Sequence, residues 1–273
     1  YFYSHVYKLS VRFLYMSKKY KYTATFDNVV FASSDIEKSS ISKASLESLR
    51  PLIPQGINLE KNIDLLGVAF NAAVVNKFNK NGDGIDSEAA VKIKDFFIHK
   101  PTNIEHDRDK IVGHIVSAGF SKYDDSSSLM SDDEALIEEN AYNIALAAVV
   151  YKTASKEFSD LVLSSTDEDS DYYSTVSASW EVGFNDYVIS VGGDDLCDST
   201  IISDPQEVEA YSPYLKSLGG KGLLKDGRKV NRLIVGEIYP LGIGFTSNPA
   251  ADVKGLIADQ GKSTPEVSSS NKP

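Results

Sequence analysis

The segment that most restricts how this chain can fold covers residues 175–184, with the sequence TVSASWEVGF. Its residues alternate between an apolar set, which includes Trp180 and Phe184, and a polar or small set, which includes Ser177, Ser179 and Glu181. Successive side chains of a strand point to opposite faces of the sheet. The alternation therefore predicts a strand that packs on a core by one face and presents two hydroxyls and a carboxylate from the other. An ordinary strand whose polar face meets solvent would show the same pattern.

The other segments divide into strands and helices, with no internal repeat. Helical spacing of apolar residues predicts a helix at 87–100, with Ser87 as its N-cap and Pro101 beyond its end. The further predicted strands are 20–32, 63–75, 111–120, 143–152 and 232–245, and the further helices are 33–49, 155–163 and 205–218. Gly219 and Gly220 are expected to stop the last helix. This order predicts an α+β domain in which strands dominate and helices pack outside them.

Composition sets the limits of the domain. Residues 1–15 are aromatic and basic and precede Met16, so we expect a translated upstream extension followed by a single domain at 16–257. Two acidic, serine-rich stretches predict solvated loops, and the polar end of the chain predicts a disordered tail. The two loops are 122–134 and 164–173, and the tail is 258–273.

Charge and cysteine content argue against several classes of protein. The net charge of −11 argues against a nucleic-acid-binding surface as the main function. The single cysteine, Cys197, allows neither an intramolecular disulfide nor a cysteine-based zinc site. No apolar run approaches the roughly 18–20 residues that would span a bilayer. We therefore expect no membrane segment.

One loop resembles the start of a calcium-binding loop. Asn79, Asn81 and Asp83 occupy its first, third and fifth positions, and Gly84 occupies the sixth. The twelfth position holds Ala90, where a calcium loop needs a bidentate glutamate. An Asn/Gly turn is therefore the better interpretation, and a calcium-binding module around Asn79–Glu88 is kept as an alternative function.

His106 is a candidate general base. It lies in a charged segment, TNIEHDRDKIVG, just before a predicted strand. An imidazole takes up and returns a proton near neutral pH, and a serine hydroxyl is a weak nucleophile until such a base accepts its proton. A surface histidine would look the same in the sequence, and no spacing shows that His106 meets a serine.

Three blocks, in order, resemble the prohead (capsid-maturation) serine proteases of tailed phages, of the T4-like and HK97-like kind related to herpesvirus assemblin. The first runs through 68–85 and 97–120 and places His106 and Gly113 where that family has its catalytic histidine and a glycine. The second, VSASWEVGF, is similar to the strand that carries the serine nucleophile. Ser179 with Glu181 matches it, and Ser177 is the slipped alternative. The third, 235–256, resembles the closing strand and ends in Asn248, Pro249 and Ala250.

The resemblance implies a mainly antiparallel, barrel-like core and a serine endopeptidase. Ser179 would be the nucleophile and His106 the base. The third catalytic member would be Glu237 by position, with Glu181 or His114 as the other choices. Backbone amides or an arginine, Arg228 or Arg232, would stabilise the oxyanion.

The resemblance also implies partners and a location. The substrates would be phage scaffold and major capsid proteins inside the assembling prohead in the host cytoplasm, and self-cleavage and a homo-oligomer would fit that setting. No cofactor, metal, nucleic acid or membrane is implied. The main alternative is a catalytically inactive virion structural or scaffold protein derived from such a protease.

Overall fold

The computed structural model describes residues 20–26, 48–59, 61–124, 128–167, 169–173, 175–246 and 257–259. Its strands are β1 (Tyr22–Phe26), β2 (Leu65–Val75), β3 (Asp83–Gly84), β4 (Pro101–Ile104), β5 (Asp107–Lys122), β6 (Leu129–Met130), β7 (Tyr142–Tyr151), β8 (Ser177–Gly192), β9 (Ser199–Ile202), β10 (Lys229–Thr246) and β11 (Ile257–Asp259). Its α-helices are α3 (Ser87–Ile93), α4 (Asp132–Ile137), α5 (Lys156–Ser165) and α6 (Pro205–Tyr211). Short 3-10 turns are η1 (Arg50–Leu52), η2 (Lys94–Phe97), η3 (Leu196–Asp198), η4 (Ser212–Tyr214) and η5 (Lys216–Leu218).

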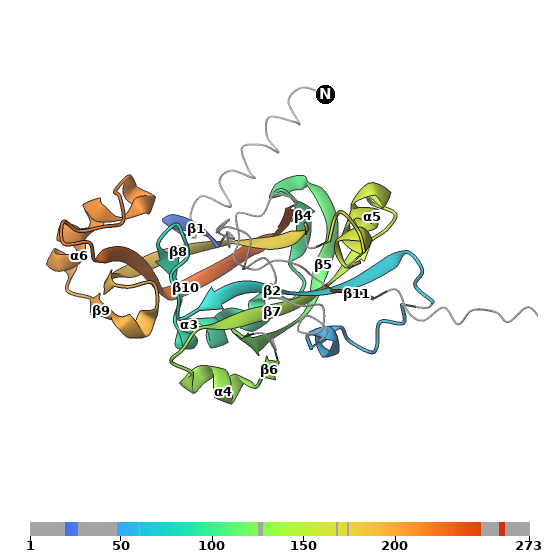
Figure 1. Cartoon of the computed structure of the whole chain (residues 1–273), viewed down its shortest axis with the longest axis horizontal. Coiled ribbons are helices and arrows are strands. Elements are labelled where there is room, and N and C mark those ends of the chain that lie inside the picture. Colours follow the sequence, from blue (N-terminus) through green and yellow to red (C-terminus); the bar gives the residue numbers. More distant parts are fainter. Residues whose placement is uncertain are drawn as a thin grey trace, which may run out of the picture.

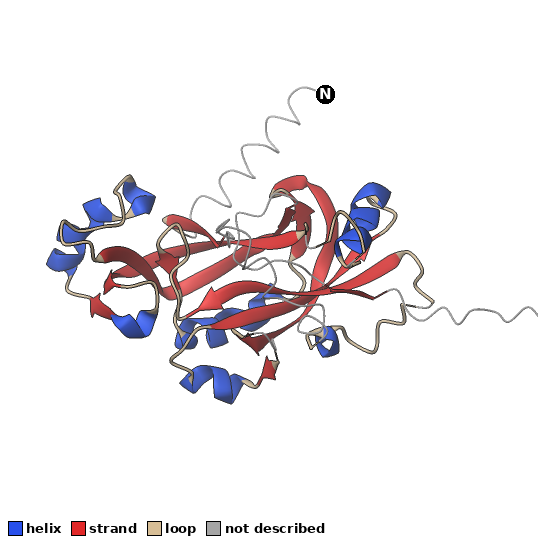
Figure 2. Cartoon of the chain, in the orientation of Figure 1, coloured by secondary structure: helices blue, strands red, loops and turns tan. Residues whose placement is uncertain are grey.

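All of these strands belong to one sheet, so the predicted α+β class is confirmed (Figures 1 and 2). The strand order is β1-β8-β10-β4-β5-β7-β2-β11, with β3 beside β10, β6 beside β5 and β9 beside β8. Among the described strands only β3 and β4 run parallel to their partner β10, and the other pairs are antiparallel. The described residues show no pairing between the end strands β1 and β11, so the sheet is open and no barrel is closed there.

The two halves of the sheet turn their apolar faces toward each other and enclose the core. In Figure 1, β8 and β10 cross over β2 and β7, while β4 and β5 connect the two halves. Phe70 of β2 meets Phe245 of β10, with ring centroids 5.4 Å apart. Trp180 lies fully buried between Phe26 and Phe97, at 4.6 and 4.9 Å. Truncating a tryptophan buried in this way costs about 3–5 kcal/mol.

The apolar face predicted for the segment 175–184 is confirmed, because the apolar residues of that segment all belong to this core. They are Val176, Ala178, Trp180, Val182 and Phe184, each at most 2% exposed. The strand extends to Gly192, eight residues beyond the alternating segment. Its opposite face carries Ser177, Ser179 and Glu181, and both serines are buried as well.

Several predicted boundaries were wrong for identifiable reasons. The helix expected at 87–100 begins after Asp86, whose carboxylate accepts a hydrogen bond from the Ala89 amide, so Ser87 is not the N-cap. Ser87 instead donates its hydroxyl to the carbonyl of Glu138. The α-helix ends at Ile93 and continues as the 3-10 turn η2.

The helix expected at 205–218 is divided into α6, η4 and η5. Pro213 has no backbone N–H and disrupts the helical ladder. The chain then ends its last turn at Gly219, whose φ of 87° is left-handed, as the glycine pair predicted.

The first predicted acidic loop is partly structured. Residues 132–137 form α4, because Ser131 and Glu134 make a reciprocal capping box at its start. Leu129 and Met130 form β6 and pair with β5. Local capping therefore gives structure to a segment whose composition indicated a loop.

Some predictions fall outside the described part of the chain. These are the extension at 1–15, most of the helix at 33–49, the residues Asn248, Pro249 and Ala250, and the tail beyond 259. Ala258 and Asp259, the first residues of the predicted tail, belong to β11 and pair with β2. Within the described residues, no helix is long and apolar enough to cross a membrane.

Candidate active site

The structure brings His106 and Ser179 together. The Nε2 atom of His106 lies 2.8 Å from Oγ of Ser179, although the residues are 73 positions apart in sequence. Ser179 is 2% exposed and His106 is half-buried. This is hydrogen-bonding distance for a base and the hydroxyl it would deprotonate.

His106 occupies the second position of a two-residue turn between β4 and β5. Ile104 pairs with Asp107, and the two residues between them, Glu105 and His106, have φ values of 52° and 57°. Two successive left-handed residues are typical of the type I′ hairpin turn, which normally uses Asn-Gly. A side chain with a Cβ costs on the order of 1 kcal/mol in this conformation. The turn is therefore strained at the residue that contacts Ser179.

Glu105 attaches this turn to the end of β10. Its backbone N–H donates to the carbonyl of Phe245 at 2.8 Å. Its carboxylate accepts the hydroxyl of Thr246, with Oγ1 at 2.9 and 3.0 Å from the two oxygens. One main-chain and one side-chain contact thus hold the left-handed turn against the sheet.

The His106 ring lies over the middle residue of a row of three across β8, β10 and β4. Ser179 is in register with Gly244, and Gly244 is in register with Asn103. A Cβ added to Gly244 would lie 2.9 Å from Cγ and from Cε1 of His106. Only glycine therefore leaves room for the imidazole between the strands.

The polar face of β8 continues on both sides of Ser179. Glu181, two residues along, pairs with Arg108, whose Nη2 lies 3.7 Å from Oε2. Arg108 lies near the start of β5, two residues after the turn that carries His106, and its ion pair brings it to the face of β8 that carries Glu181. Ser177, the slipped alternative, is buried and pairs in register with Thr246, but His106 contacts Ser179.

Glu237, our first choice as the third member, is not brought to this pair. It lies at a bulge of β10, about seven residues from Gly244, or roughly 20 Å along the strand. It is exposed, and its carboxylate accepts the hydroxyl of Tyr239 at 2.5 Å. The bulge turns this part of β10 to solvent.

The other two choices also have different partners. Glu181 is close to Ser179 but forms its ion pair with Arg108. His114 lies on β5, separated from β8 by β4 and β10, about 14 Å away. Its Nδ1 atom is 2.7 Å from the Tyr151 hydroxyl. Burial, and secondarily the charge of His99, lowers the pKa of His114 below its usual 6.5.

Neither arginine named for the oxyanion is near Ser179. Arg232 forms a buried ion pair with Asp83 at 2.6 Å, and it pairs with Ile189, roughly 30 Å along β8 from Ser179. Arg228 is exposed and bonds Asp226. The arginine that the structure brings to the polar face of β8 is Arg108. Apart from its position near His106, nothing in the sequence pointed to this residue.

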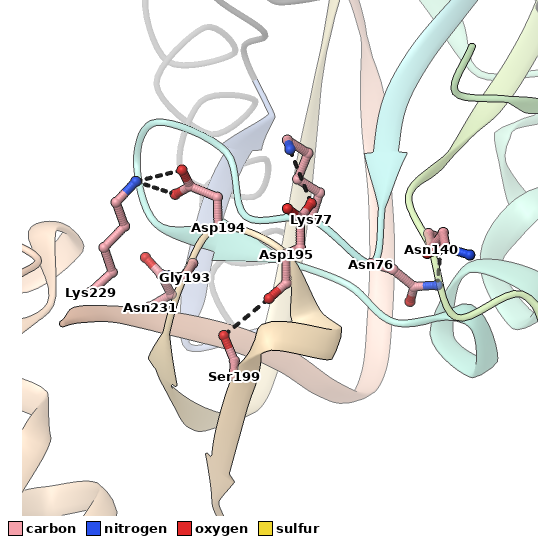
Figure 3. Close-up of polar contacts among 9 residues, drawn as sticks. All are labelled: Asn76, Lys77, Asn140, Gly193, Asp194, Asp195, Ser199, Lys229 and Asn231. Carbon is pink, nitrogen blue, oxygen red and sulfur yellow. Dashed lines mark hydrogen bonds and ion pairs between the residues drawn. The ribbon is translucent and has the colours of Figure 1, made fainter.

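The calcium-like loop uses its side chains to hold itself in place. Asn79 Oδ1 accepts the amides of Asn81 and Asp83, while Asp83 bonds Arg232. The neighbouring Lys77 pairs with Asp195 at 3.0 Å, which fastens the loop to the turn between β8 and β9 (Figure 3). No cluster of three metal-binding side chains occurs in the described ranges. Asn79 and Asp83, which a calcium loop would use as oxygen ligands, thus have structural partners, in agreement with the Asn/Gly turn.

A search of family models, of curated proteins and of solved structures found no match to this chain in any of the three. The roles of these residues are therefore argued from their geometry. Sequence reasoning did not identify Gly244, Asn103 or Glu105. The sequence analysis predicted a loop around Glu105 and His106, and β4 and the start of β5 on either side of the turn were not predicted.

Proposed function

We propose that this protein is a serine endopeptidase in which Ser179 is the nucleophile and His106 the general base. The observation that carries the proposal is the 2.8 Å contact between His106 Nε2 and Ser179 Oγ. Such a contact lets the imidazole accept the hydroxyl proton as Oγ attacks a peptide carbonyl. The imidazolium then gives that proton to the leaving amine as the peptide bond breaks. Water next attacks the acyl group on Oγ and gives its proton to His106, which returns the proton to Oγ as the acid is released.

Arg108 is the residue best placed to stabilise the oxyanion. Its guanidinium lies 3.7 Å from Glu181, on the face of β8 that carries Ser179, and its side chain is 57% exposed. A positive group at that position would favour the negative charge that develops on the carbonyl oxygen. Glu181 would hold the guanidinium there until a substrate arrives.

Capsid maturation is the setting that the three sequence blocks favour. They imply phage scaffold and major capsid proteins as substrates, within an assembling prohead in the host cytoplasm. They also imply an assemblin-like, barrel-like arrangement as the finer description of the open sheet. These finer statements rest on the order of the blocks around His106 and Ser179.

The strained turn favours an active enzyme over an inactive structural descendant. An inert protein would gain stability by replacing His106 with glycine, because a left-handed residue without a Cβ is unstrained. A histidine held in this conformation, against a nucleophile candidate and over a glycine, is costly without a function. Strain of this kind is characteristic of functional sites.

The proposal is tested by labelling with a small fluorophosphonate. In this reaction Ser179 Oγ forms a bond to phosphorus, fluoride leaves and His106 takes the proton. A small reagent suits a serine that is only 2% exposed. We expect one label on the peptide carrying Ser179, lost in Ser179→Ala, strongly slowed in His106→Ala and retained in Ser177→Ala.

A cleavage assay then tests the peptidase activity. Processing of a co-expressed scaffold protein should stop in Ser179→Ala and in His106→Ala and continue in Glu237→Gln. Equal labelling of His106→Ala and wild type, or unchanged processing in either mutant of the pair, would contradict the proposal.

A further inference from the structure

The pair His106 and Ser179 lacks a visible partner for the second ring nitrogen. In the described ranges, Nδ1 of His106 has no hydrogen bond to a carboxylate or to another histidine. A histidine base needs Nδ1 protonated so that Nε2 can accept the serine proton, and a hydrogen-bond acceptor at Nδ1 fixes this tautomer. Among the described residues, therefore, the structure shows no group that fixes the tautomer of His106 by accepting a hydrogen bond from Nδ1.

Asn103 lies on the same face of the sheet as Ser179, on the other side of Gly244. Each of these three residues stands between core-facing neighbours of its own strand. Because strand side chains alternate, all three point away from the core and toward the His106 turn. Gly244 has no side chain, and the three atoms nearest to the position of a Cβ there all belong to His106. The neighbours are Ala178 and Trp180 for Ser179, Ile243 and Phe245 for Gly244, and Thr102 and Ile104 for Asn103.

The side-chain oxygen of Asn103 is a buried acceptor without a partner among the described residues. Asn103 is 7% exposed, and its Oδ1 atom has no hydrogen bond within the described residues. Leaving a buried acceptor unsatisfied costs about 1–3 kcal/mol, so most such groups find a donor. The donor that the geometry offers is the imidazole above Gly244.

The orientation of the ring agrees with this pairing. Cγ and Cε1 of His106 would be equally close, at 2.9 Å, to a Cβ on Gly244, so the ring lies over that residue. Nε2 is directed to Ser179 on β8. The two nitrogens of an imidazole point in widely different directions, so Nδ1 is turned away from β8, and β4 with Asn103 is the strand on that side of β10.

We propose that Asn103 is the third member of the site, a positioning residue whose side-chain oxygen accepts the Nδ1 proton of His106. The inference rests on the proposed function and deepens it. An amide fixes the tautomer as a carboxylate would but carries no charge, and a Cys-His-Asn arrangement in other proteases shows that an amide can fill this position. The pairing needs the Asn103 amide or the His106 ring to rotate toward the other, because the two side chains are not hydrogen-bonded in the structure.

The direct test is the tautomer of His106, measured by nitrogen NMR of the full chain in a Ser179→Ala background. Removing the serine keeps the measurement independent of catalysis, so it reports on Asn103 even if the chain cleaves no peptide. His106→Gln identifies the signal among the four histidines. We expect neutral His106 to be protonated at Nδ1, and Asn103→Ala to lose this preference.

Kinetics give a second readout in the wild-type background. Losing one neutral hydrogen bond should reduce the labelling rate of Ser179 about 5- to 30-fold, with little change in KM for peptide substrates. Asn103→Asp, which keeps the shape and adds a charge, should restore the rate and move the acidic limb of the pH profile to higher pH, because a carboxylate favours the imidazolium.

Asn143 supplies the matched control. It is buried on β7, and its Oδ1 also lacks a partner among the described residues, but it lies away from His106. Asn143→Ala should leave the tautomer and the labelling rate unchanged. An unchanged tautomer in Asn103→Ala, or an equal loss of rate in Asn143→Ala, would overturn the assignment of Asn103. Absence of any labelling in wild type, with the tautomer still dependent on Asn103, would overturn only the peptidase proposal.

Discussion

The imidazole of His106 lies over Gly244, in a space that one methyl group would fill. A Cβ at this glycine would be 2.9 Å from ring atoms and from the backbone nitrogen of His106. Such a contact forces the ring or the turn to move. The space left by this glycine therefore helps to set the distance between His106 and Ser179.

Gly244→Ala should separate the base from the serine while the sheet stays folded. A displacement of about 1 Å at a reacting pair can reduce the rate on the order of 100-fold. The measurement is the rate of fluorophosphonate labelling, together with circular dichroism to confirm folding. Gly56→Ala is the matched control, because nothing lies within 4 Å of its added Cβ. Full labelling in Gly244→Ala would show that the ring position is not critical.

The strained turn predicts an unusual order of stability at position 106. Glycine removes the strain that a Cβ causes in a left-handed backbone, and alanine does not. His106→Gly should therefore be more stable than His106→Ala by about 1 kcal/mol. Both variants lose the imidazole, so the comparison isolates the backbone. Urea unfolding measures the difference. At His114, which lies in regular strand β5, alanine should instead be the more stable substitution. The same order at both positions would count against strain in the turn.

The sequence predicted the individual elements of the site better than the contacts between them. Alternation in 175–184 identified the face of β8 that carries Ser179, because period-two patterning is local. The contact with His106 depends on the register of β8 with β10 and of β10 with β4, and register between distant strands leaves no local pattern. Only the family resemblance suggested that the two residues meet.

The distance of Glu237 from His106 and Ser179 has the same cause. Glu237 was chosen by its position before the end of β10, but two bulges shift the register, between Val235 and Ile238 and between Pro240 and Gly242. The bulges carry Glu237 out to solvent, and they could not be read from the sequence. The α+β class was predictable from the elements, whereas the open edge of the sheet was not.

Arg108 should affect catalysis far more than stability. Its ion pair with Glu181 is exposed on both sides, at 57% and 32%, and such pairs contribute about 0–1 kcal/mol. If the guanidinium stabilises the oxyanion, Arg108→Ala should lower kcat for peptide cleavage about 100- to 1000-fold. Arg228→Ala is the control, because Arg228 is an exposed arginine that bonds Asp226 instead. Equal kcat values for the two variants would remove Arg108 from the mechanism.

His114 should make the fold sensitive to mild acid. Burial first, and the charge of His99 second, lowers the pKa of His114 in the folded state below 6.5. Protonation therefore favours the unfolded chain: the stabilising contribution is complete above pH 6.5 and is lost as the pH falls through the lower, folded pKa. Urea unfolding at pH 7.5 and 5.5 should show a smaller loss for His114→Gln than for wild type. His99→Gln should give an intermediate loss, and an unchanged pH dependence in His114→Gln would contradict the assignment.

The buried pair Asp83 and Arg232 should support the fold without taking part in catalysis. Both side chains are nearly inaccessible, at 4% and 3% exposure, and the guanidinium also lies 4.8 Å from the centroid of the Phe184 ring. Removing one partner leaves the other charge buried and unpaired, which costs about 3–5 kcal/mol. Asp83→Asn and Arg232→Met should each lower the free energy of unfolding strongly, and the double variant should lose less than the sum of the two.

Labelling of Ser179 distinguishes this structural role from a catalytic one. The pair lies roughly 30 Å along β8 from Ser179, so variants that remain folded at low temperature should be labelled at the wild-type rate. A selective loss of labelling in folded Arg232→Met would restore Arg232 as an oxyanion candidate. The same variants test the calcium alternative, because a loop whose Asp83 is committed to Arg232 should show no heat of binding at micromolar calcium in wild type. Binding there, abolished by Asp83→Asn, would mean that the ion competes successfully with the guanidinium for this carboxylate.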